Sequence, residues 1–436
     1  MNGQESVYEL KEFKKSRNSY MMECTFEYFV ALLISGAYLS NLLSAIGMSD
    51  AMVGMVSSLA SLAFIFQLIS MFLIQKITNT KMLASFIHLG GRMFFVTLYF
   101  IPFFDFIPDA YKGVTAMICI ALGYLGNYMV TTIIYKWGNS FVHPSKRATF
   151  SATKEMLSLI CGMVFTFVMG QAVDYYDQIG KSDSAFIFLG VTILIATISD
   201  FVCLMIMKRE YKPDKTVRSE PLSKVLGELV KNKSYVCLVI LDCLHKAAVY
   251  VLSGFMGTFQ LKELGMTVGL VSIVSIISNG ARFLVSRPIG RFSDKTSYVT
   301  GITLGLAIKA LGYIFIVIIK PDLWWMVIIY QVLYNISVAA TNQNLMSAVY
   351  SYVDKEHFVH ALSIKNCTSG IVGFLVSLVA AAIVRAVQGE SGTGVMHLFG
   401  MDIYVQQFLA LISLILTVIT FLFALLVMRK RKIIGK

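Results

Sequence analysis

Long apolar segments follow one another along this 436-residue chain, separated by short polar gaps. An α-helix needs about 20 apolar residues to cross the ~30 Å hydrocarbon layer of a bilayer. About twelve segments reach that length; they lie near residues 20–45, 51–75, 82–104, 113–138, 149–171, 184–207, 235–260, 265–288, 298–319, 322–349, 359–385 and 402–428. Because a membrane-spanning segment must satisfy its own backbone hydrogen bonds, the pattern predicts an all-α polytopic membrane protein.

The composition supports a bilayer as the surrounding medium. Hydrophobic residues make up 57% of the chain and charged residues only 14%, whereas soluble domains carry about 25% charged residues. The net charge of +12 raises the question of nucleic acid binding. The basic residues are, however, spread over the gaps between apolar segments, so we expect lipid contact and no nucleic acid partner.

Lysine and arginine are unequally shared between alternate gaps, and this predicts orientation. The rich set includes the N-terminal segment, residues 208–234 and the tail "RKRK", while the other gaps hold single lysines or arginines. We therefore expect a multi-pass protein of the cell (inner) membrane with both termini in the cytoplasm.

The only long connection, residues 208–234, divides the predicted spans six and six. Its apolar residues at helical spacing, with lysines nearby, predict an amphipathic helix on the membrane surface. The expected organisation is a cytoplasmic N-terminal segment, a first six-helix bundle, a cytoplasmic linker, a second six-helix bundle and a basic cytoplasmic tail. Their bounds are 1–19, 20–207, 208–234, 235–428 and 429–436.

An internal repeat relates the two halves at an offset of about 215 residues. Matching positions keep their chemical character and their order. The matched pairs are Tyr20 with Tyr235, Glu27 with Asp242, Arg92 with Lys309, Lys154 with Lys365, and Gly162 with Gly373. This order predicts two parallel, pseudo-symmetric bundles.

The gap "GRFSDK" resembles the loop signature of the major facilitator superfamily, a Gly-x-x-x-Asp-basic pattern. Gly290 is expected to make a tight turn, and Asp294 to cap the next helix or pair with a base. The first-half counterpart at 74–81 lacks both the glycine and the acid. With the topology, the resemblance covers essentially the whole chain. It implies twelve helices, transport by alternating access, and a polar cavity lined by spans 1, 4, 7 and 10.

That resemblance selects the candidate site residues, because ionisable and polar groups at membrane depth are functional candidates. For proton coupling we select Glu27 and Asp242, with His245 as a relay. The candidate substrate-binding residues are Tyr28, Asn127, His245, Lys246, Gln331, Tyr334, Asn335 and Asn342. Amides suit hydrogen bonds to a hydroxyl-rich solute, and aromatic rings can stack on a sugar.

Structural roles compete with these assignments. Glu27 can pair with Arg92, and Asp242 with Lys309, as symmetric ion pairs within each half. Buried amides also hold membrane helices together. Lys154 and Lys365 are expected to hold an inner gate or to extend toward the interface. Glu23 is expected at a solvated helix end.

Catalytic and metal-binding motifs are absent from the sequence, so we expect no enzyme activity, no cofactor and no metal site. The leading hypothesis is a monomeric secondary transporter that imports a small polar solute, a sugar or glycoside, with protons. A proton-coupled drug or metabolite exporter is an alternative, although the Gly-Pro-rich motif of antiporters is missing from span 5. An organic anion such as a sugar acid is another, with Arg92, Lys246 and Lys309 as counter-charges. A membrane enzyme or a receptor is the competing class, and it would need a reactive cluster or a signalling domain.

Overall fold

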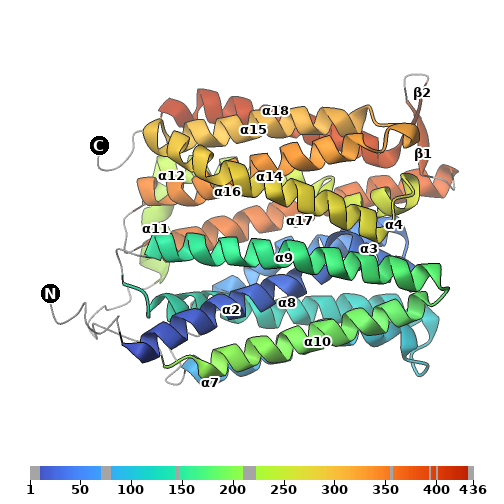
Figure 1. Cartoon of the computed structure of the whole chain (residues 1–436). Helices are drawn as coiled ribbons and strands as arrows, with labels where there is room; N and C mark the ends of the chain where they lie inside the picture. The colour runs from blue at the N-terminus through green and yellow to red at the C-terminus, as the bar shows by residue number, and fades with distance from the viewer. Residues whose placement is uncertain are drawn as a thin grey trace. The chain divides into compact units, whose positions relative to one another are not determined.

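The computed structural model describes residues 10–69, 80–143, 147–209, 222–353, 357–391, 394–398 and 401–430, nearly all of them helical (Figure 1). The N-terminal nine residues, most of the first-half loop at 74–81, much of the linker and the end of the tail lie outside these ranges.

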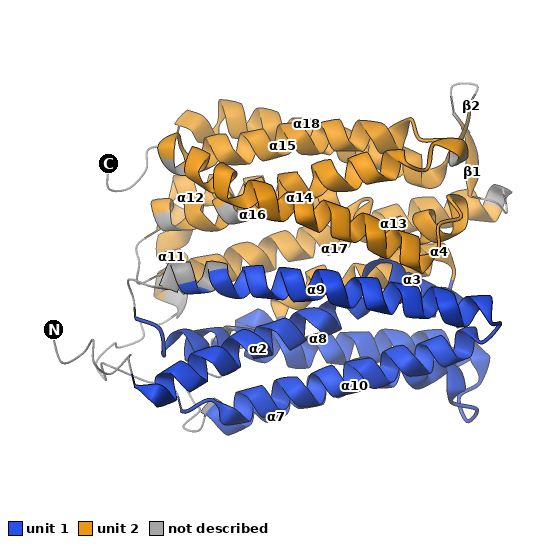
Figure 2. Ribbon diagram, in the orientation of Figure 1, with its two compact units in different colours: residues 1–48, 66–217 blue, residues 49–65, 218–436 orange. Residues whose placement is uncertain are grey.

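The chain forms two compact units, shown in different colours in Figure 2. Unit 1 comprises residues 1–48 and 66–217, and unit 2 comprises residues 49–65 and 218–436. The helices of unit 1 are α2 (Lys11–Leu33), α3 (Gly36–Ala45), α7 (Thr80–Phe100), η2 (Ile101–Phe103), α8 (Asp109–Asn139), α9 (Arg147–Gln178) and α10 (Ser182–Ile206).

Unit 2 contains the remaining elements. Its first segment holds α4 (Asp50–Ser57), α5 (Leu59–Leu62) and η1 (Ala63–Ile65). The others are α11 (Leu222–Lys231), α12 (Lys233–Tyr250), η4 (Ser253–Phe255), α13 (Met256–Thr258), η5 (Phe259–Glu263), α14 (Val268–Lys295), α15 (Tyr298–Val317), η6 (Pro321–Leu323), α16 (Met326–Tyr352), α17 (Phe358–Ser391), β1 (Val395–Leu398), β2 (Met401–Tyr404), α18 (Val405–Leu426) and η7 (Met428–Lys430).

The described residues account for the expected membrane spans. Ten helices are long and apolar enough to cross a bilayer, and the pair α2 and α3, bent by 46°, makes an eleventh. Helix α16 has 27 residues, about 40 Å of helix, and is the twelfth despite its polar side chains. The predicted all-α fold is confirmed. Helix α2 starts at Lys11, inside the segment that we assigned to an N-terminal tail.

The internal repeat has a structural counterpart, because the same helix pairs form in both units. Helix α2 packs against α9 and α10, as α12 packs against α17 and α18. Helix α7 packs against α8 and α10, as α15 packs against α16 and α18. Each unit is therefore closed by equivalent contacts between its first, third, fourth, fifth and sixth spans.

Residues 49–65, most of the second predicted span, pack within unit 2, whereas the prediction placed that whole span in the first bundle; the predicted boundary at residue 207 stays a prediction. Asp50 is buried there and accepts hydrogen bonds from Lys262 and from Gln388 Nε2, the latter at 2.8 Å. A Cβ atom on Gly254 would lie 2.5 Å from the Gly54 carbonyl oxygen, so glycine permits this contact between backbones. Sequence order alone could not show such long-range packing.

The turn predicted at Gly290 is wrong. Helix α14 continues through Pro288 and Gly290 to Lys295. The chain turns at Thr296 and Ser297, and the Ser297 side chain caps α15 by accepting from Thr300 N at 3.1 Å. A glycine lowers helix stability by only about 1 kcal/mol, which packing readily overrides. The side chain of Asp294 lies outside the described residues, so its predicted capping or gating role stays a prediction.

Two connections between spans contain secondary structure, of which only the first was predicted. The expected linker helix is present as α11, with Leu229 buried against α12 and Val230 exposed. A β-hairpin precedes α18 and was not predicted: β1 pairs antiparallel with β2, with Val395 opposite Tyr404. Its eight residues of mixed polarity had been divided between a loop and the last span.

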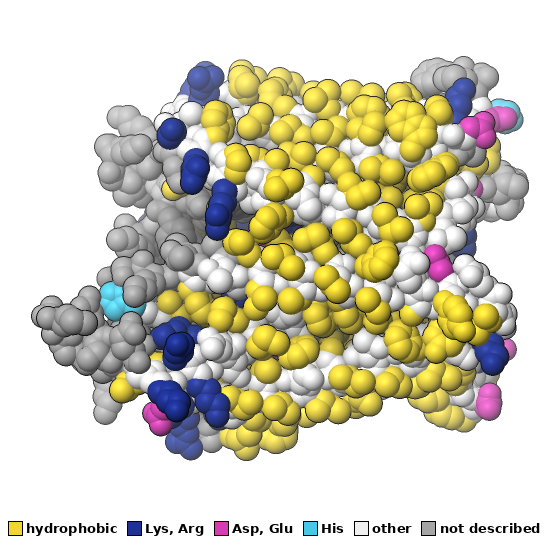
Figure 3. Space-filling view, in the orientation of Figure 1, with side chains coloured by type: hydrophobic (Ala, Val, Ile, Leu, Met, Phe, Trp, Pro, Cys, Tyr) yellow, Lys and Arg dark blue, Asp and Glu magenta, His cyan; other side chains and the backbone are white. Residues whose placement is uncertain are grey.

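The outer surface of the helices is apolar. In the view of Figure 3, hydrophobic side chains cover the middle of the helices, and lysine and arginine side chains gather at helix ends. Leu284, Ile195 and Val168 are 72%, 60% and 50% exposed. So large an apolar surface requires lipid around it.

Close helix packing in unit 1 leads to a first prediction. A Cβ atom on Gly91 of α7 would lie 2.8 Å from the Gly126 Cα atom of α8, whereas one on Gly90 would meet nothing within 4 Å. We expect Gly91→Leu to destabilise the protein by about 1–3 kcal/mol through overpacking, measured as a lower thermal unfolding midpoint of the purified protein. Gly90→Leu is the matched control and should leave the midpoint unchanged or higher. Equal losses in both variants would contradict the close approach.

Candidate functional site

Arg92 of α7 lies in the interior of unit 1 between two carboxylates. Its Nη2 atom is 3.7 Å from Glu27 Oε1 of α2, and its Nη1 atom is 3.8 Å from Asp200 Oδ1 of α10. Arg92 and Asp200 are buried, while Glu27 is one-third exposed. The predicted Glu27–Arg92 pair is present, and Asp200 is a second acid in the same network. Arg92 therefore links a partly exposed carboxylate to a buried one.

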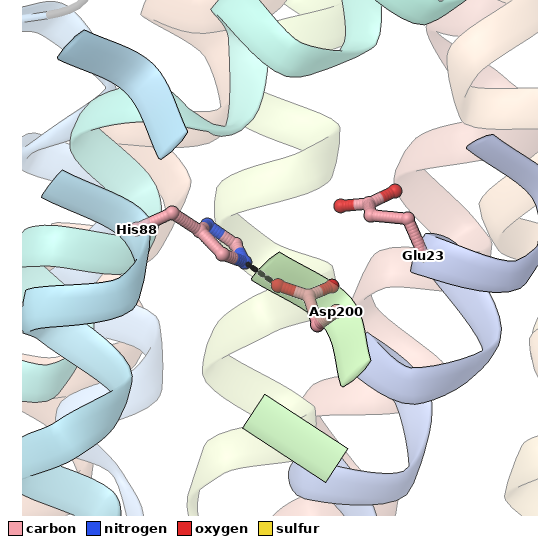
Figure 4. Close-up of side chains that lie close together, drawn as sticks. All are labelled: Glu23, His88 and Asp200. Atoms are coloured by element: carbon pink, nitrogen blue, oxygen red, sulfur yellow. Dashed lines mark ion pairs between the residues drawn. The ribbon is translucent and has the colours of Figure 1, made fainter. Parts of the chain in front are cut away.

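His88, one helical turn before Arg92, extends this network. Its Nε2 atom lies 3.1 Å from Asp200 Oδ2, the contact drawn as a dashed line in Figure 4. The Glu23 carboxyl group of α2 faces this pair in the same view. Glu23, His88 and Asp200 are each about 1% exposed.

The burial of Glu23 corrects our expectation of a solvated helix end. Helix α2 continues for three turns before Glu23, so this residue lies inside the bundle and not at its edge. His88 and Asp200 were missed because the resemblance directed attention to spans 1, 4, 7 and 10. Two signals were available: His88 and Arg92 are four residues apart on one helix face, and Asp200 is the one acid in the apolar stretch 184–207.

Unit 2 contains a different charge pair at the repeat-related position. Lys365 Nζ of α17 donates to Asp242 Oδ2 of α12 at 2.6 Å, and both side chains are buried. The predicted partner of Asp242, Lys309, was wrong. Lys365 was expected to hold a gate or extend toward the interface, and instead it neutralises Asp242 inside the unit.

Lys309 of α15 is 1% exposed, and its ammonium group has no hydrogen-bond partner among the described residues. It lies 5.1 Å from the centroid of the Tyr334 ring, a cation–π contact. His245 is buried near it with an unpartnered Nδ1 atom. Lys246, the next residue of α12, lies 5.7 Å from the Phe64 ring and 5.8 Å from the Tyr250 ring.

In unit 1, Lys154 of α9 donates to the Tyr20 hydroxyl at 3.3 Å and lies 4.7 Å from that ring. Lys154 and Lys365 are related by the repeat, yet only Lys365 forms a close ion pair. Glu27 is paired with Arg92, whereas its repeat partner Asp242 is paired with Lys365.

The amide candidates differ in what they contact. Asn335 Nδ2 donates to the Gln331 carbonyl oxygen within α16 at 3.0 Å, and Asn342 is exposed. The Asn127 Oδ1 atom of α8 is buried without a hydrogen-bond partner in the part of the chain described. Outside our candidates, Gln407 donates to the carbonyl oxygens of Val317 and Ile319 at 3.0 and 2.8 Å, so this amide joins helices.

The aromatic candidates pack closely. The Tyr28 ring fills the space beside Gly162, where a Cβ atom would approach within 2.3 Å. Tyr334 lies 5.7 Å from Tyr330, ring centroid to centroid, with its face toward Lys309. Unit 2 thus places an aromatic ring face, the amides of α16 and three lysines in one bundle.

A metal ion needs several donor atoms at short mutual distances. Glu23, His88 and Asp200 meet this condition, with donor atoms within 4.8 Å of one another. The Arg92 guanidinium beside Asp200 opposes a divalent cation there, because it already supplies a positive charge. We therefore assign this donor set no metal.

Comparisons with known proteins agree with this architecture. A family model described as Major Facilitator Superfamily matches residues 20–377. A search of curated protein sequences found no significant match. Among solved structures, a mutant of the nucleoside transporter NupG has a TM-score of 0.72 at 14% identity, covering 94% of this chain and 99% of its own. A D-xylose-proton symporter has a TM-score of 0.71 at 11% identity, with 95% and 97% coverage. An auto-inhibited POT family peptide transporter has 0.68 at 11% identity, with 97% and 98% coverage.

Twelve spans in two repeated units, together with the family match, indicate a membrane transporter and not an enzyme. The chain belongs to the Major Facilitator Superfamily, since the family model matches most of its length. It is a multi-pass membrane transporter.

The lysines of unit 2 lead to a second prediction. Lys365→Met leaves Asp242 buried without a partner, which costs about 3–5 kcal/mol. Lys309→Met removes a buried ammonium group that has no hydrogen-bond partner among the described residues, so stability should be unchanged or higher. Thermal unfolding of both variants measures the difference. A large loss of stability in Lys309→Met with none in Lys365→Met would show that Lys309, and not Lys365, is the partner of Asp242.

Proposed function

We propose that this transporter moves a small polar solute across the cell membrane by alternating access, driven by protons, with both chain termini in the cytoplasm. A sugar or glycoside is the first substrate class, and import is the direction. Glu27 is the carboxylate through which protons enter the first unit.

The observation that carries the proton coupling is the position of Arg92 between Glu27 and Asp200, at 3.7 and 3.8 Å. Both distances are longer than a hydrogen bond, so the guanidinium group can move closer to one acid or the other. When Glu27 is protonated and loses its charge, the electrostatic attraction of Asp200 for Arg92 is no longer opposed. Glu27 is one-third exposed and Asp200 is buried, so we assign the exchange of protons with water to Glu27.

Asp242, our second coupling candidate, is less suited to this role. The Lys365 ammonium group at 2.6 Å stabilises the charged carboxylate, so protonation of Asp242 requires that pair to break. We assign Asp242 a structural role, with Lys365 as its partner.

The substrate class is supported by the polar face of α16. Gln331, Asn335 and Asn342 recur at helical spacing, and the Tyr334 ring lies on the neighbouring face. Amides that donate and accept hydrogen bonds suit hydroxyl groups, and an aromatic face suits a sugar or nucleoside ring. Two of the similar structures are a nucleoside transporter and a sugar-proton symporter.

One observation favours a second substrate class, an organic anion such as a sugar acid. In unit 2 the buried Asp242 forms its ion pair with Lys365, whereas Lys246 and Lys309 lie close to aromatic rings. The two remaining lysines can neutralise a solute carboxylate or phosphate.

A proteoliposome experiment provides a third prediction. Purified protein should accumulate one member of a labelled panel of sugars, glycosides, nucleosides and sugar acids when the lumen is alkaline. Glu27→Gln should abolish accumulation driven by the pH gradient but retain exchange of labelled for unlabelled solute, because exchange needs no net proton movement.

The control is Asp183→Asn, which changes an exposed acid at the start of α10 and should behave as wild type. Undiminished gradient-driven accumulation in Glu27→Gln would reject the assignment of Glu27. Preference for sugar acids would identify the anion class. Failure of the whole panel, with drug-dependent proton release instead, would indicate an exporter.

A further inference from the structure

We propose that Glu23, His88 and Asp200 form a binding site for one proton in the interior of unit 1. That this proton is the coupling proton rests on the function proposed above; that the three side chains bind a proton does not.

The three groups come from three helices and meet at one point. Glu23 lies on α2, His88 on α7 and Asp200 on α10, and their donor atoms lie within 4.8 Å of one another. Figure 4 shows the Glu23 carboxyl group facing the His88–Asp200 pair. Two carboxylates so close cannot both remain ionised in a dry interior unless a cation or a proton lies between them.

The cluster has unused hydrogen-bonding capacity. His88 Nδ1 is buried without a partner in the described part of the chain. Both Asp200 carboxylate oxygens also lack hydrogen-bond geometry, although His88 Nε2 is 3.1 Å away. In a neutral imidazole only one ring nitrogen carries a hydrogen atom, so the other nitrogen and the Asp200 oxygens are acceptors without a donor. The cluster therefore has acceptor atoms available to bind a further proton.

The charges around the site also leave room for one proton. Glu23 interacts electrostatically with Asp200, Glu27 and Arg92, and Lys154 interacts with Glu23 and Glu27. Three carboxylates thus face two strongly basic side chains, which leaves one negative charge when His88 is neutral. A single proton makes the buried network neutral, and a neutral network is favoured in low dielectric.

The same count distinguishes a proton from a metal ion. A divalent cation would leave the network with a net positive charge next to Arg92. Sodium carries the required single charge but prefers oxygen ligands, and an imidazole nitrogen supplies one of the three donors here. A proton uses both the imidazole and the carboxylates.

Other titratable groups surround the cluster and belong to its environment. They are Tyr20, Cys24 and Glu27 on α2, Arg92 on α7, Tyr135 on α8, Lys154 on α9 and Cys203 on α10. Cys24 Sγ donates a hydrogen bond to Glu23 Oε2 at 3.2 Å.

Unit 2 shows that the helices of such a bundle can pack together without ionisable side chains at the positions related by the repeat to Glu23 and His88. At the repeat offsets set by Glu27 with Asp242 and by Arg92 with Lys309, Glu23 corresponds to Leu238 and His88 to Gly305. Leu238 is fully buried, and Gly305 packs against Ala340 and Thr341. The ionisable groups of unit 1 therefore mark a feature beyond helix packing.

The test, our fourth prediction, reads protonation without any substrate. Infrared difference spectra of the full-length protein in lipid nanodiscs are recorded between pH 8 and pH 5, roughly the range in which histidine-containing sites titrate. We expect a carboxyl or imidazole band that titrates as one proton. Asp200→Asn and Glu23→Gln should each remove it, and His88→Gln should shift its midpoint. The control Asp183→Asn should retain it.

Absence of a titrating band in the wild type, or an unchanged band in all three cluster variants, overturns the proposal. Should one variant fail to fold, the other two still decide the outcome. Wild-type protein is also mixed with Mn²⁺ or Zn²⁺ alone in a calorimeter. Binding of one equivalent that is lost in Asp200→Asn would overturn the proton site in favour of a metal site.

These results separate the site from the transport function. A titrating band with no accumulation of any solute under a pH gradient would retain the site and reject proton-driven transport. Accumulation driven by the pH gradient without a titrating band would retain proton-driven transport and reject the proton site.

Discussion

Arg92 is the side chain on which the interior of unit 1 depends. A guanidinium group at membrane depth is tolerated only with charged partners, and Arg92 has two, Glu27 and Asp200. Asp200 in turn holds His88, and Glu23 faces the same group. Helices α2, α7 and α10 are thus joined by charges that would each be costly alone. Removing one member exposes the others to that cost.

The two units share helix pairing but not interior chemistry. Unit 1 has an arginine-centred network with several acids. Among the described residues of unit 2, Asp242 pairs with Lys365, Asp50 pairs with Lys262, and the Lys309 ammonium group has no hydrogen-bond partner. Two halves with the same helix packing but different buried charges can have different functions. In our proposals unit 1 binds the proton and unit 2 contacts the solute.

Much of the architecture could be predicted, because spans are local and the repeat preserves spacing. The Glu27–Arg92 pair was also predictable, since the two residues lie at comparable depths. Lys309 was assigned to Asp242 on the same reasoning, and this was wrong because Lys365 on α17 lies closer. Depth along a helix can be counted from residue numbers, but the direction in which a side chain points around the bundle depends on tertiary packing.

The sequence by itself determined that this chain crosses a membrane many times in two related halves, because hydrophobic length and composition are properties of single segments. Only the tertiary structure decided which charges meet. Glu23, His88 and Asp200 are separated by 65 and 112 residues along the chain and come together on three helices. The second span joins unit 2 through Asp50 and closely packed glycines for the same reason. Contacts between distant segments depend on side-chain shape and on how helices rotate against one another, and a residue's position in the chain specifies neither.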